Sequence, residues 1–599
     1  MKKLLISFFL FFLTSPAWAT TFWVRTDGGA YGTTSTTCNG QYDVAYTAGN
    51  GPNCAVSHPS YLLGSGYSTS PGEHSSGIMS AGDIGIVKSG SYAINYLMPG
   101  NVSCSESWTY QCELMPPPNG SVGNVTKLIG CSATGCSSES DRPQFYLQGR
   151  LNHVMNLSSS SYIEISDIEI TDHYGADAEC SYGLPLQECG RSVFYANAGG
   201  TWSNLTFTRL DIHGLTGSAF GKFAGGGYTH DVGTWLIQDS NLDGNQFAGI
   251  DMDDCSNNGT CGIIGNISFD NVNMRWNGCA EAYPVVWGTD GTNGVDGRLP
   301  TAGSCREGNN GGYGDMLGTS DTGGDWSFTD CNFSHNTSDS IDLLYCGRTD
   351  RQNYGTCSVS VKRTLFEGNN GQAIKGPNPT IEDNLIIGNC SFWGENTEGY
   401  AAASFASCRA QGTPISIQFR NSSAASIVNN TILGEGDVIF GYEGTECTLN
   451  VYNNILIGGY QYCQDAVAMY YTESCGTTND VNEDYNLSWQ SFKDGYTIMS
   501  GANDKASTDP VFSGSVYTGT TSYTCSGNRY TGTVYYQNLD IGVTSPCIDS
   551  ADETVSGADS LDYNSFSRGA SWDIGALEYG SEPASETSPL NVFRGTWRF

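Results

Sequence analysis

A short pattern of apolar residues recurs along this chain, and it restricts the possible fold more strongly than any other feature. In each copy two apolar residues alternate as on a strand with one buried face, one position is skipped, and the alternation resumes. Ile267, Phe269, Val272 and Met274 hold these places in one copy. The copies are YIEISDIEI, LTFTRLDI, WLIQDSNL, NISFDNVNM, WSFTDCNF, VSVKRTLF, LIIGNCSF and LNVYNNIL. A strand that bends at the skipped position and then continues would produce this pattern.

The spacing of the copies indicates a solenoid. Successive copies are often roughly 23 to 33 residues apart, which is the length of one coil in a repeat protein. Most copies are followed by a polar corner, such as DGNQ, RWNG, SHNTSD or EGNNG. Longer gaps, such as 280–325, hold Gly-rich loops with cysteines. We therefore predict an all-β protein, a parallel β-helix with capped ends and long disulfide-stapled loops.

The chain divides into five predicted segments. Lys2 and Lys3, an apolar run and an Ala-Trp-Ala exit at 17–19 indicate a signal peptide over 1–19, so we expect a secreted or periplasmic monomer after cleavage near Ala19. No later segment is apolar enough to insert in a membrane. The other predicted segments are an N-terminal cap with first coils (20–150), the β-helix core (151–490), C-terminal coils with a closing cap (491–580) and a flexible tail (581–599).

Cysteine content and charge restrict the compartment and the partners. All 22 cysteines follow Ala19, so up to eleven disulfides are possible in an oxidising setting. Close pairs that resemble loop staples are Cys104/Cys112, Cys131/Cys136, Cys180/Cys189 and Cys255/Cys261. Zinc is the weaker alternative, because no Cys-x-x-Cys spacing occurs. The net charge of −35 argues against nucleic acid and anionic membranes as partners. The acidic residues either form a solvated surface or collect divalent cations.

Three successive corners contain the strongest candidate site. They hold Asp315, then Asp339 and Asp342, then Lys375. Equivalent positions of adjacent β-helix coils stack about 4.8 Å apart, so these side chains are expected to meet. Clustered carboxylates suit calcium, and a lysine beside such a cation is favoured in its neutral, basic form. The alternative is that all four are solvated turn residues.

The stretch 313–396 resembles the core of polysaccharide lyase family nine, secreted calcium-dependent pectate lyases on a right-handed parallel β-helix. The matching strings are GDML around Asp315, NTSDSIDL at 336–343 and GQAIKG at 371–376. The resemblance implies that Asp315, Asp339 and Asp342 bind calcium. It also implies that Lys375 is the base that removes the C5 proton of a uronate in a β-elimination. Ser338 departs from the family pattern, because it replaces a ligand carboxylate, and Ser340 replaces a glycine.

The sequence contains further candidate site residues and is compatible with other functions. Arg348, Arg351 and Arg363 are candidates to hold substrate carboxylates, or are exposed loop cations. A second acidic cluster, Asp251, Asp253 and Asp254, suggests a structural or calcium site, or a carboxylate pair for glycoside hydrolysis. The chain lacks the Gly-His-Gly element of β-helix polygalacturonases. The alternatives to a lyase are therefore a non-enzymatic adhesin that binds surface glycans, and a β-helix glycoside hydrolase.

Overall fold

A computed structural model describes the chain between residues 19 and 580. The predicted tail 581–599 and all of the predicted signal peptide except Ala19 lie outside the described residues. Within 19–580 the undescribed residues are 33, 68–74, 96–97, 100–111, 148–150, 152, 158, 173–191, 196–201, 222–228, 252–261, 283–285, 288–297, 306–313, 320–321, 348–356, 389–392, 394–408, 410–411, 420–423, 435–437, 459–469, 490–498, 500, 514–523, 527–528, 532–538 and 556–559.

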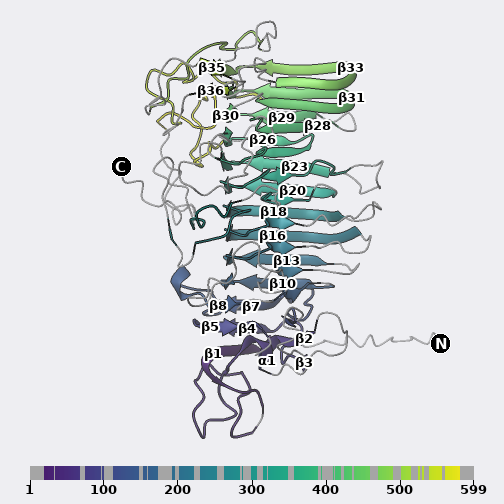
Figure 1. The fold of residues 1–599 in the computed structure, drawn as a ribbon, viewed down its shortest axis with the longest axis vertical. Helices are drawn as coiled ribbons and strands as arrows, with labels where there is room; N and C mark the ends of the chain where they lie inside the picture. Colours follow the sequence, from purple (N-terminus) through teal and green to yellow (C-terminus); the bar gives the residue numbers. More distant parts are fainter. Residues whose placement is uncertain are drawn as a thin grey trace, which may run out of the picture.

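The chain winds into coils that stack along the long axis of the molecule (Figure 1). The coils contribute parallel strands to each of three sheets. Within a sheet, the strands of neighbouring coils pair residue by residue. Ile267, for example, pairs with Trp235 of the coil before and with Trp326 of the coil after. The predicted parallel β-helix is therefore confirmed.

The first sheet contains β1 (Thr21–Gly29), β4 (Ile84–Val87), β7 (Thr126–Gly130), β10 (Ser161–Ser166), β13 (Ser203–Thr208), β16 (Thr229–Asp243), β18 (Gly262–Arg275), β20 (Gly324–Thr329), β23 (Cys357–Lys362), β26 (Thr380–Glu382), β29 (Ala424–Val428), β31 (Ile439–Tyr452) and β33 (Tyr470–Asp484). The second contains β5 (Ser91–Ala93), β8 (Gln144–Tyr146), β11 (Glu169–Thr171), β14 (Asp211–His213), the ends of β16 and β18, β21 (Asn332–Ser334), β24 (Leu365–Glu367), β27 (Leu385–Gly388), β30 (Thr431–Gly434), β32 (Ile455–Ile457) and β34 (Leu487–Trp489).

The third sheet contains β6 (Cys112–Leu114), β9 (His153–Asn156), β12 (Ser192–Tyr195), β15 (Ser218–Gly221), β17 (Ala248–Asp251), β19 (Leu317–Gly318), β22 (Ile341–Asp342), β25 (Ile374–Pro377) and β28 (Ile415–Gln418), and continues into the first halves of β31 and β33. Near the N-terminus lie the helix α1 (Pro59–Leu63) and the short strands β2 (Gly64–Tyr67) and β3 (Ser75–Ser76). A hairpin of β35 (Thr524–Ser526) and β36 (Arg529–Thr531) lies in the C-terminal part.

The skipped position of the sequence pattern is the corner between the first and second sheets. Its residue has a left-handed backbone in successive coils, with φ between 45° and 59° at Asp167, Arg209, Asp239, Asn271, Asp330 and Arg363. Asp and Asn tolerate this conformation better than most residues. The strand therefore turns there, and the apolar pattern residues on both sides of the corner, such as Phe269 and Val272, lie in the core.

One copy of the pattern was placed in the wrong phase. In the copy LIIGNCSF, Leu385 should precede the skipped position, but β27 belongs to the second sheet and follows a corner at Asp383 (φ 56°). The first-sheet strand of that coil is β26, which is only three residues long. A further corner at Asn429 (φ 57°) joins β29 to β30, which form a copy that was not predicted from the sequence.

Buried asparagines stack into ladders at the corners. Asn277 Nδ2 donates to Asn336 Oδ1 (3.0 Å), and Asn336 Nδ2 donates to Asn369 Oδ1 (3.0 Å). A second ladder runs through Asn384, Asn430, Asn454 and Asn486. Because each amide both donates and accepts along the stack, these buried polar groups are satisfied coil by coil.

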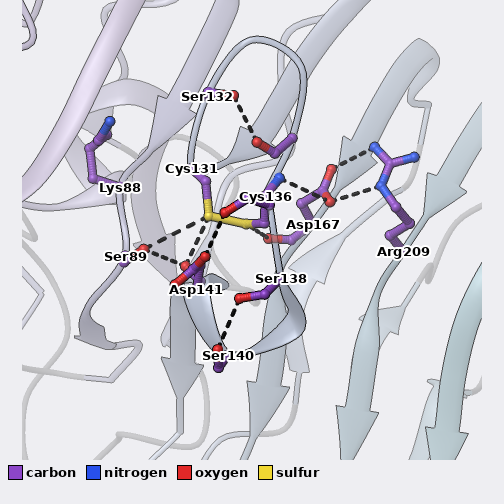
Figure 2. The surroundings of a disulfide bond; sticks show 12 residues. Lys88, Ser89, Cys131, Ser132, Cys136, Ser138, Ser140, Asp141, Asp167 and Arg209 are labelled. Carbon is purple, nitrogen blue, oxygen red and sulfur yellow. Dashed lines mark hydrogen bonds and ion pairs between the residues drawn. A yellow bond between two sulfur atoms is a disulfide. The ribbon is translucent and has the colours of Figure 1, made fainter. Parts of the chain in front are cut away.

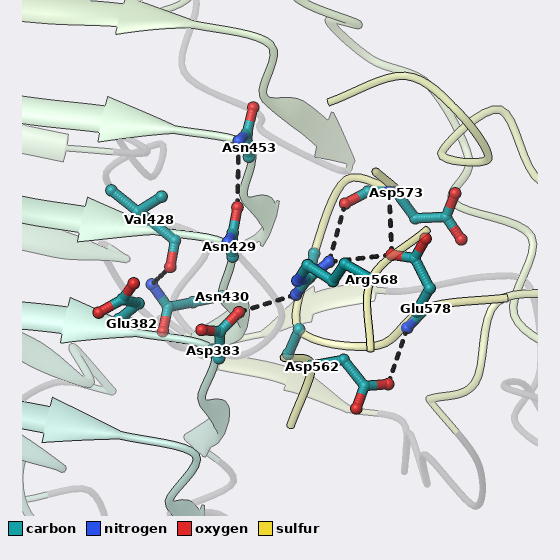
Figure 3. Close-up of polar contacts among 12 residues, drawn as sticks. Glu382, Asp383, Val428, Asn429, Asn430, Asn453, Asp562, Arg568, Asp573 and Glu578 are labelled. Carbon is teal, nitrogen blue, oxygen red and sulfur yellow. Dashed lines mark hydrogen bonds and ion pairs between the residues drawn. The ribbon is translucent and has the colours of Figure 1, made fainter. Parts of the chain in front are cut away.

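The C-terminal segment, which contains Leu539 and Leu577, packs against the outer side of the second sheet. Its Leu539, Ile541, Ile574 and Leu577 share a buried cluster with apolar residues of β24, β27, β30, β32 and β34. Figure 3 shows the polar centre of this contact, where Arg568 reaches Asp383 (2.8 Å) across 185 residues of sequence.

Disulfides staple several loops in the described parts of the chain. Bonds join Cys38–Cys54, Cys131–Cys136, Cys279–Cys305 and Cys346–Cys357. The predicted pair Cys131/Cys136 is confirmed (Figure 2), and Cys112 is also disulfide-bonded. The predicted pairs Cys180/Cys189 and Cys255/Cys261 lie outside the described residues. Cys331 and Cys547 are buried free thiols, so the upper limit of eleven disulfides is not reached. No helix among the described residues is long and apolar enough to cross a bilayer.

A buried ion network anchors the segment between β18 and β19. His213 of β14 lies 2.7 Å from Glu281 (Nδ1 to Oε2) and 3.1 Å from Glu169 (Nε2 to Oε1). Arg298 donates to both oxygens of Asp211 at 2.6 Å and lies 3.2 Å from Glu281. This network and the disulfide Cys279–Cys305 fix the chain shortly before it reaches Asp315.

The protonation of His213 should make stability depend on pH. Burial and Arg298 lower the pKa of His213, but Glu281 and Glu169 outweigh them and raise it to about 9. A histidine whose pKa is raised on folding stabilises the folded state fully when the pH is below the unfolded pKa, near 6.5. This stabilisation is lost as the pH rises through the folded pKa of about 9, and the free energy of unfolding then falls by about 3 kcal/mol. Denaturant unfolding should therefore show wild type losing stability from pH 6 to 9, and His213→Gln losing much less. Parallel curves for both proteins would contradict this role.

Candidate active site

The candidate residues gather on the third sheet, at three successive coils. Asp342 of β22 pairs in register with Gly318 of β19 and with Lys375 of β25. Asp315 and Asp339 lie at the corners that lead into β19 and β22. Residues distant in sequence thus become neighbours because the coils stack in register.

The three carboxylates form one compact, buried cluster. Asp315, Asp339 and Asp342 each offer an oxygen within 4.8 Å of the others, and their exposed fractions are 1%, 3% and 7%. Backbone amides hold them: Asp339 N donates to Asp315 Oδ1 (2.9 Å), and Gln372 N donates to Asp339 Oδ1 (2.6 Å). The coil backbone therefore helps to orient the carboxylates of Asp315 and Asp339.

Gly371 permits this close packing. A side chain at position 371 would place its Cβ about 2.1 Å from Asp339 Oδ1 and 2.7 Å from Asp339 N. The Gln372 amide could then no longer approach the Asp339 carboxylate. The glycine in GQAIKG is therefore required by the close approach of two coils.

Lys375 completes the cluster from the following coil. Its Nζ lies 2.9 Å from Asp342 Oδ2 and 3.3 Å from Asp339 Oδ2. Only 18% of its side chain is exposed. Burial lowers the pKa of Lys375, but Asp339 and Asp342 outweigh burial and raise it above its ordinary value. With the carboxylates bare, Lys375 is therefore held in its protonated form.

The cluster carries more negative charge than Lys375 neutralises. Burial, Asp339 and Asp342 together raise the pKa of Asp315 well above its ordinary value. The pKa of Asp342 is also raised, chiefly by burial, although Lys375 opposes the rise. Excess buried charge of this kind is relieved by a bound proton or by a bound cation. The donor set, hard carboxylate oxygens held by backbone bonds, fits calcium.

A further residue, Arg409, lies at the site and was not predicted from the sequence. Its Nη1 bonds Ser338 Oγ and lies 3.7 Å from Asp315 Oδ1. Its backbone N donates to Asn370 O (3.0 Å), which holds it beside the corner that precedes Lys375. Arg409 comes from the long segment between β27 and β28, which contains no repeat that could have predicted its position.

The other predicted site residues are distributed differently. Asp251 of β17 pairs in register with Gly318, so it lies in the same row as Asp342, two coils earlier. At about 4.8 Å per coil this separation is roughly 10 Å. Arg363 lies at a corner of the first sheet, where Nε donates to Asp330 Oδ1 (2.8 Å), and not in the cluster. Arg348, Arg351, Asp253 and Asp254 lie outside the described residues.

The chain matches no protein-family model and no curated protein sequence. Among solved structures it is similar to a rhamnogalacturonan lyase, with 10% identity and a TM-score of 0.32 over 78% of this chain and 87% of that chain. It is also similar to a pectate lyase (11%, TM-score 0.30, 93% and 96%). A third is a PL6 family polysaccharide lyase from Pseudopedobacter saltans (11%, TM-score 0.34, 72% and 88%). At these identities and scores the comparisons say nothing about the activity of this chain.

Proposed function

We propose that this chain is an exported polysaccharide lyase that cleaves a uronate-containing glycan by β-elimination, with Lys375 as the base and calcium as the cofactor. The supporting observation is the contact of a half-buried lysine amine with a compact cluster of three buried carboxylates. Its resemblance to polysaccharide lyase family nine rests on the same residues. The disulfides fit an extracytoplasmic location.

Each residue has a chemical role in the proposed reaction. The C5 proton of a uronate is weakly acidic, because only the adjacent carboxylate delocalises the carbanion charge. The neutral Lys375 amine removes this proton, the C4–O4 bond breaks as the C4=C5 double bond forms, and the departing oxygen takes up a proton from water. Asp339 and Asp342 hold the Lys375 Nζ in position.

Asp315, Asp339 and Asp342 would hold the calcium ion. When bound, calcium would supply positive charge that stabilises the negative charge developing on the substrate carboxylate. The same three carboxylates raise the pKa of Lys375, so their charge determines how readily the amine becomes a base.

The excess charge gives a prediction that does not depend on activity. A carboxyl group whose pKa is raised on folding contributes stability to the folded state when the pH is below its unfolded pKa, near 3.9. This contribution is lost as the pH rises through the folded pKa. Asp315→Asn should therefore stabilise the metal-free protein at pH 8 and abolish the calcium-induced rise in melting temperature. Calorimetry in EDTA and in calcium measures both effects. A variant that is less stable in EDTA, or that keeps the calcium response, would contradict the proposed site.

The row that links Asp342 to Asp251 supports a second candidate function. Paired carboxylates on one face suit glycoside hydrolysis, and Asp251 and Asp342 lie in one row, two coils apart. Incubation with polygalacturonate, alginate and neutral polysaccharides, with and without calcium, distinguishes the activities. The lyase proposal predicts ultraviolet absorbance from an unsaturated uronate, only with uronate polymers and more strongly with calcium. New reducing ends without absorbance would favour the hydrolase, and binding without cleavage the adhesin.

A further inference from the structure

We propose that Trp287 is a second glycan-binding site, at which the indole ring stacks on a pyranose ring of a polysaccharide. Trp287 is the most exposed tryptophan in the described part of the chain, with 61% of its surface accessible. Trp202, Trp235 and Trp326, in contrast, are at most 1% exposed. Folding therefore leaves the Trp287 ring in water, although burial of an aromatic ring is strongly favourable. A ligand can gain that free energy by covering the ring.

One side of the ring rests on the protein and is held in place. Trp287 forms an antiparallel bridge with Arg298, and Arg298 Cζ lies 4.8 Å from the ring centroid. A guanidinium in this position is attracted to the face of the ring. Arg298 is only 4% exposed, and its guanidinium donates to both oxygens of Asp211 at 2.6 Å. The indole is therefore preorganised, so a ligand binds it at a small entropic cost.

Trp287 is anchored to a different sheet from the candidate active site. Arg298, which supports the ring, binds Asp211 of β14, and β14 belongs to the second sheet. Asp342 and Lys375 lie on the third sheet. A glycan bound at Trp287 therefore makes contacts that are separate from those of the carboxylate cluster.

The acidic groups beneath the ring have cationic partners. Asp211 pairs with Arg298, and Glu281 and Glu169 pair with the protonated His213. The chain as a whole carries a net charge of −35. A polyanion is repelled less by these paired carboxylates than by acidic groups that have no counter-charge. The ring is therefore compatible with uronate polymers as well as with neutral glycans.

A pyranose ring is the ligand that best fits a single exposed indole. One face of a pyranose carries several C–H groups, and the electron-rich face of an aromatic ring attracts these weakly positive hydrogens. The sugar hydroxyls point outward from the ring and stay in water. A protein partner would need about 800 Å² on each side, whereas one aromatic side chain buries about 150–250 Å². The exposed surface is therefore large enough for a sugar and too small for a stable protein interface.

The proposed lyase function gives this site a use, although binding at Trp287 does not depend on that function. A polymer held at Trp287 raises the local concentration of its other sugar units around the molecule. Trp287→Ala should therefore leave the cleavage of a tetramer unchanged. Its KM for a long polymer should rise by about the same factor by which its affinity for the polymer falls.

Native electrophoresis through gels that contain a polysaccharide measures the binding. Gels with polygalacturonate, alginate or neutral xylan are run in EDTA, beside a gel without polysaccharide. Wild type should be retarded by at least one polymer, and Trp287→Ala should weaken that affinity by about tenfold, the effect of losing a stacking contact. Trp287→Tyr keeps an aromatic ring and should recover part of the retardation. Tyr31→Ala removes a ring that is 45% exposed, and this matched control should bind like wild type.

Three results would overturn the inference: no polymer retards wild type, Trp287→Ala is retarded as strongly as wild type, or Trp287→Ala sediments as a smaller species. In the last case the ring would contact a second copy of the chain. Melting curves verify that the variants fold. Cleavage tests the lyase proposal separately. Unsaturated product together with unchanged retardation of Trp287→Ala refutes only the glycan site, and lost retardation without cleavage of any uronate polymer refutes only the lyase.

Discussion

Replacing Lys375 with methionine should reduce the cleavage of polyuronate by about a hundred- to ten-thousandfold, the usual contribution of a positioned general base. Methionine keeps the unbranched apolar chain as far as Cε but lacks the amine that accepts a proton. The fold should persist, because Ile374 and the rest of β25 keep their places in the sheet. Initial rates of absorbance increase, measured at saturating and at low substrate, show whether kcat carries the loss.

The appropriate control is another lysine with a similar ion pair. Lys362 of β23 lies 2.6 Å from the buried Glu382, but on the first sheet. Lys362→Met should keep nearly full activity. The calcium-induced rise in melting temperature should persist in Lys375→Met, because the three carboxylates are intact. Retention of more than a tenth of wild-type activity by Lys375→Met would show that another group is the base.

Replacing Arg568 with methionine should cost about 3–5 kcal/mol of stability, the penalty for removing one partner of a buried ion pair. Both Arg568 and Asp383 have fully buried side chains. Arg568 also lies 3.2 Å from Glu578 and donates to Gly575 O (2.9 Å). The substitution removes the guanidinium that contacts both carboxylates, where the C-terminal segment meets the coils (Figure 3).

A double-mutant cycle tests this explanation. Asp383→Asn in the Arg568→Met background removes the uncompensated charge and should recover a measurable part of the lost stability. Arg25→Met, which breaks exposed pairs with Asp27 and Asp43, should change stability by less than about 1 kcal/mol. Chemical denaturation measures the free energies, and limited proteolysis shows whether the C-terminal segment detaches first. Equal losses for Arg568→Met and Arg25→Met would contradict the account.

The repeat predicted the coil, the inward rows and the meeting of Asp342 with Lys375. It did so because coils that stack in register place residues 33 positions apart in the sequence opposite each other on adjacent strands. The skipped position correctly predicted where the strand bends. In the structure its residue has a left-handed backbone, which Asp and Asn tolerate better than most residues, and these two often occupy the position. Where the first strand shortens to three residues, as before Asp383, the apolar run LIIG follows the corner, whereas the pattern predicted that it precedes one.

Contacts made by the aperiodic parts of the chain were beyond prediction. Arg409 belongs to the long segment between β27 and β28, and no sequence pattern predicts the path of that segment. His213 lies on a regular coil, but its partner Glu281 lies 68 residues later, in the segment between β18 and β19. Arg568 and Asp383 are separated by 185 residues. In each case a single charged side chain finds its partner through tertiary packing, for which periodicity contains no signal.

Mass analysis of the products in oxygen-labelled water tests the central claim most directly. Purified protein is incubated with calcium and the uronate polymer that gives the strongest absorbance, beside Lys375→Met as the control. Elimination predicts oligosaccharides that are lighter by one water than hydrolysis products, carry a C4=C5 double bond and gain no label from the bond cleavage. Products that are saturated and labelled at the newly formed end would show hydrolysis and contradict the assignment of Lys375 as the base of a lyase.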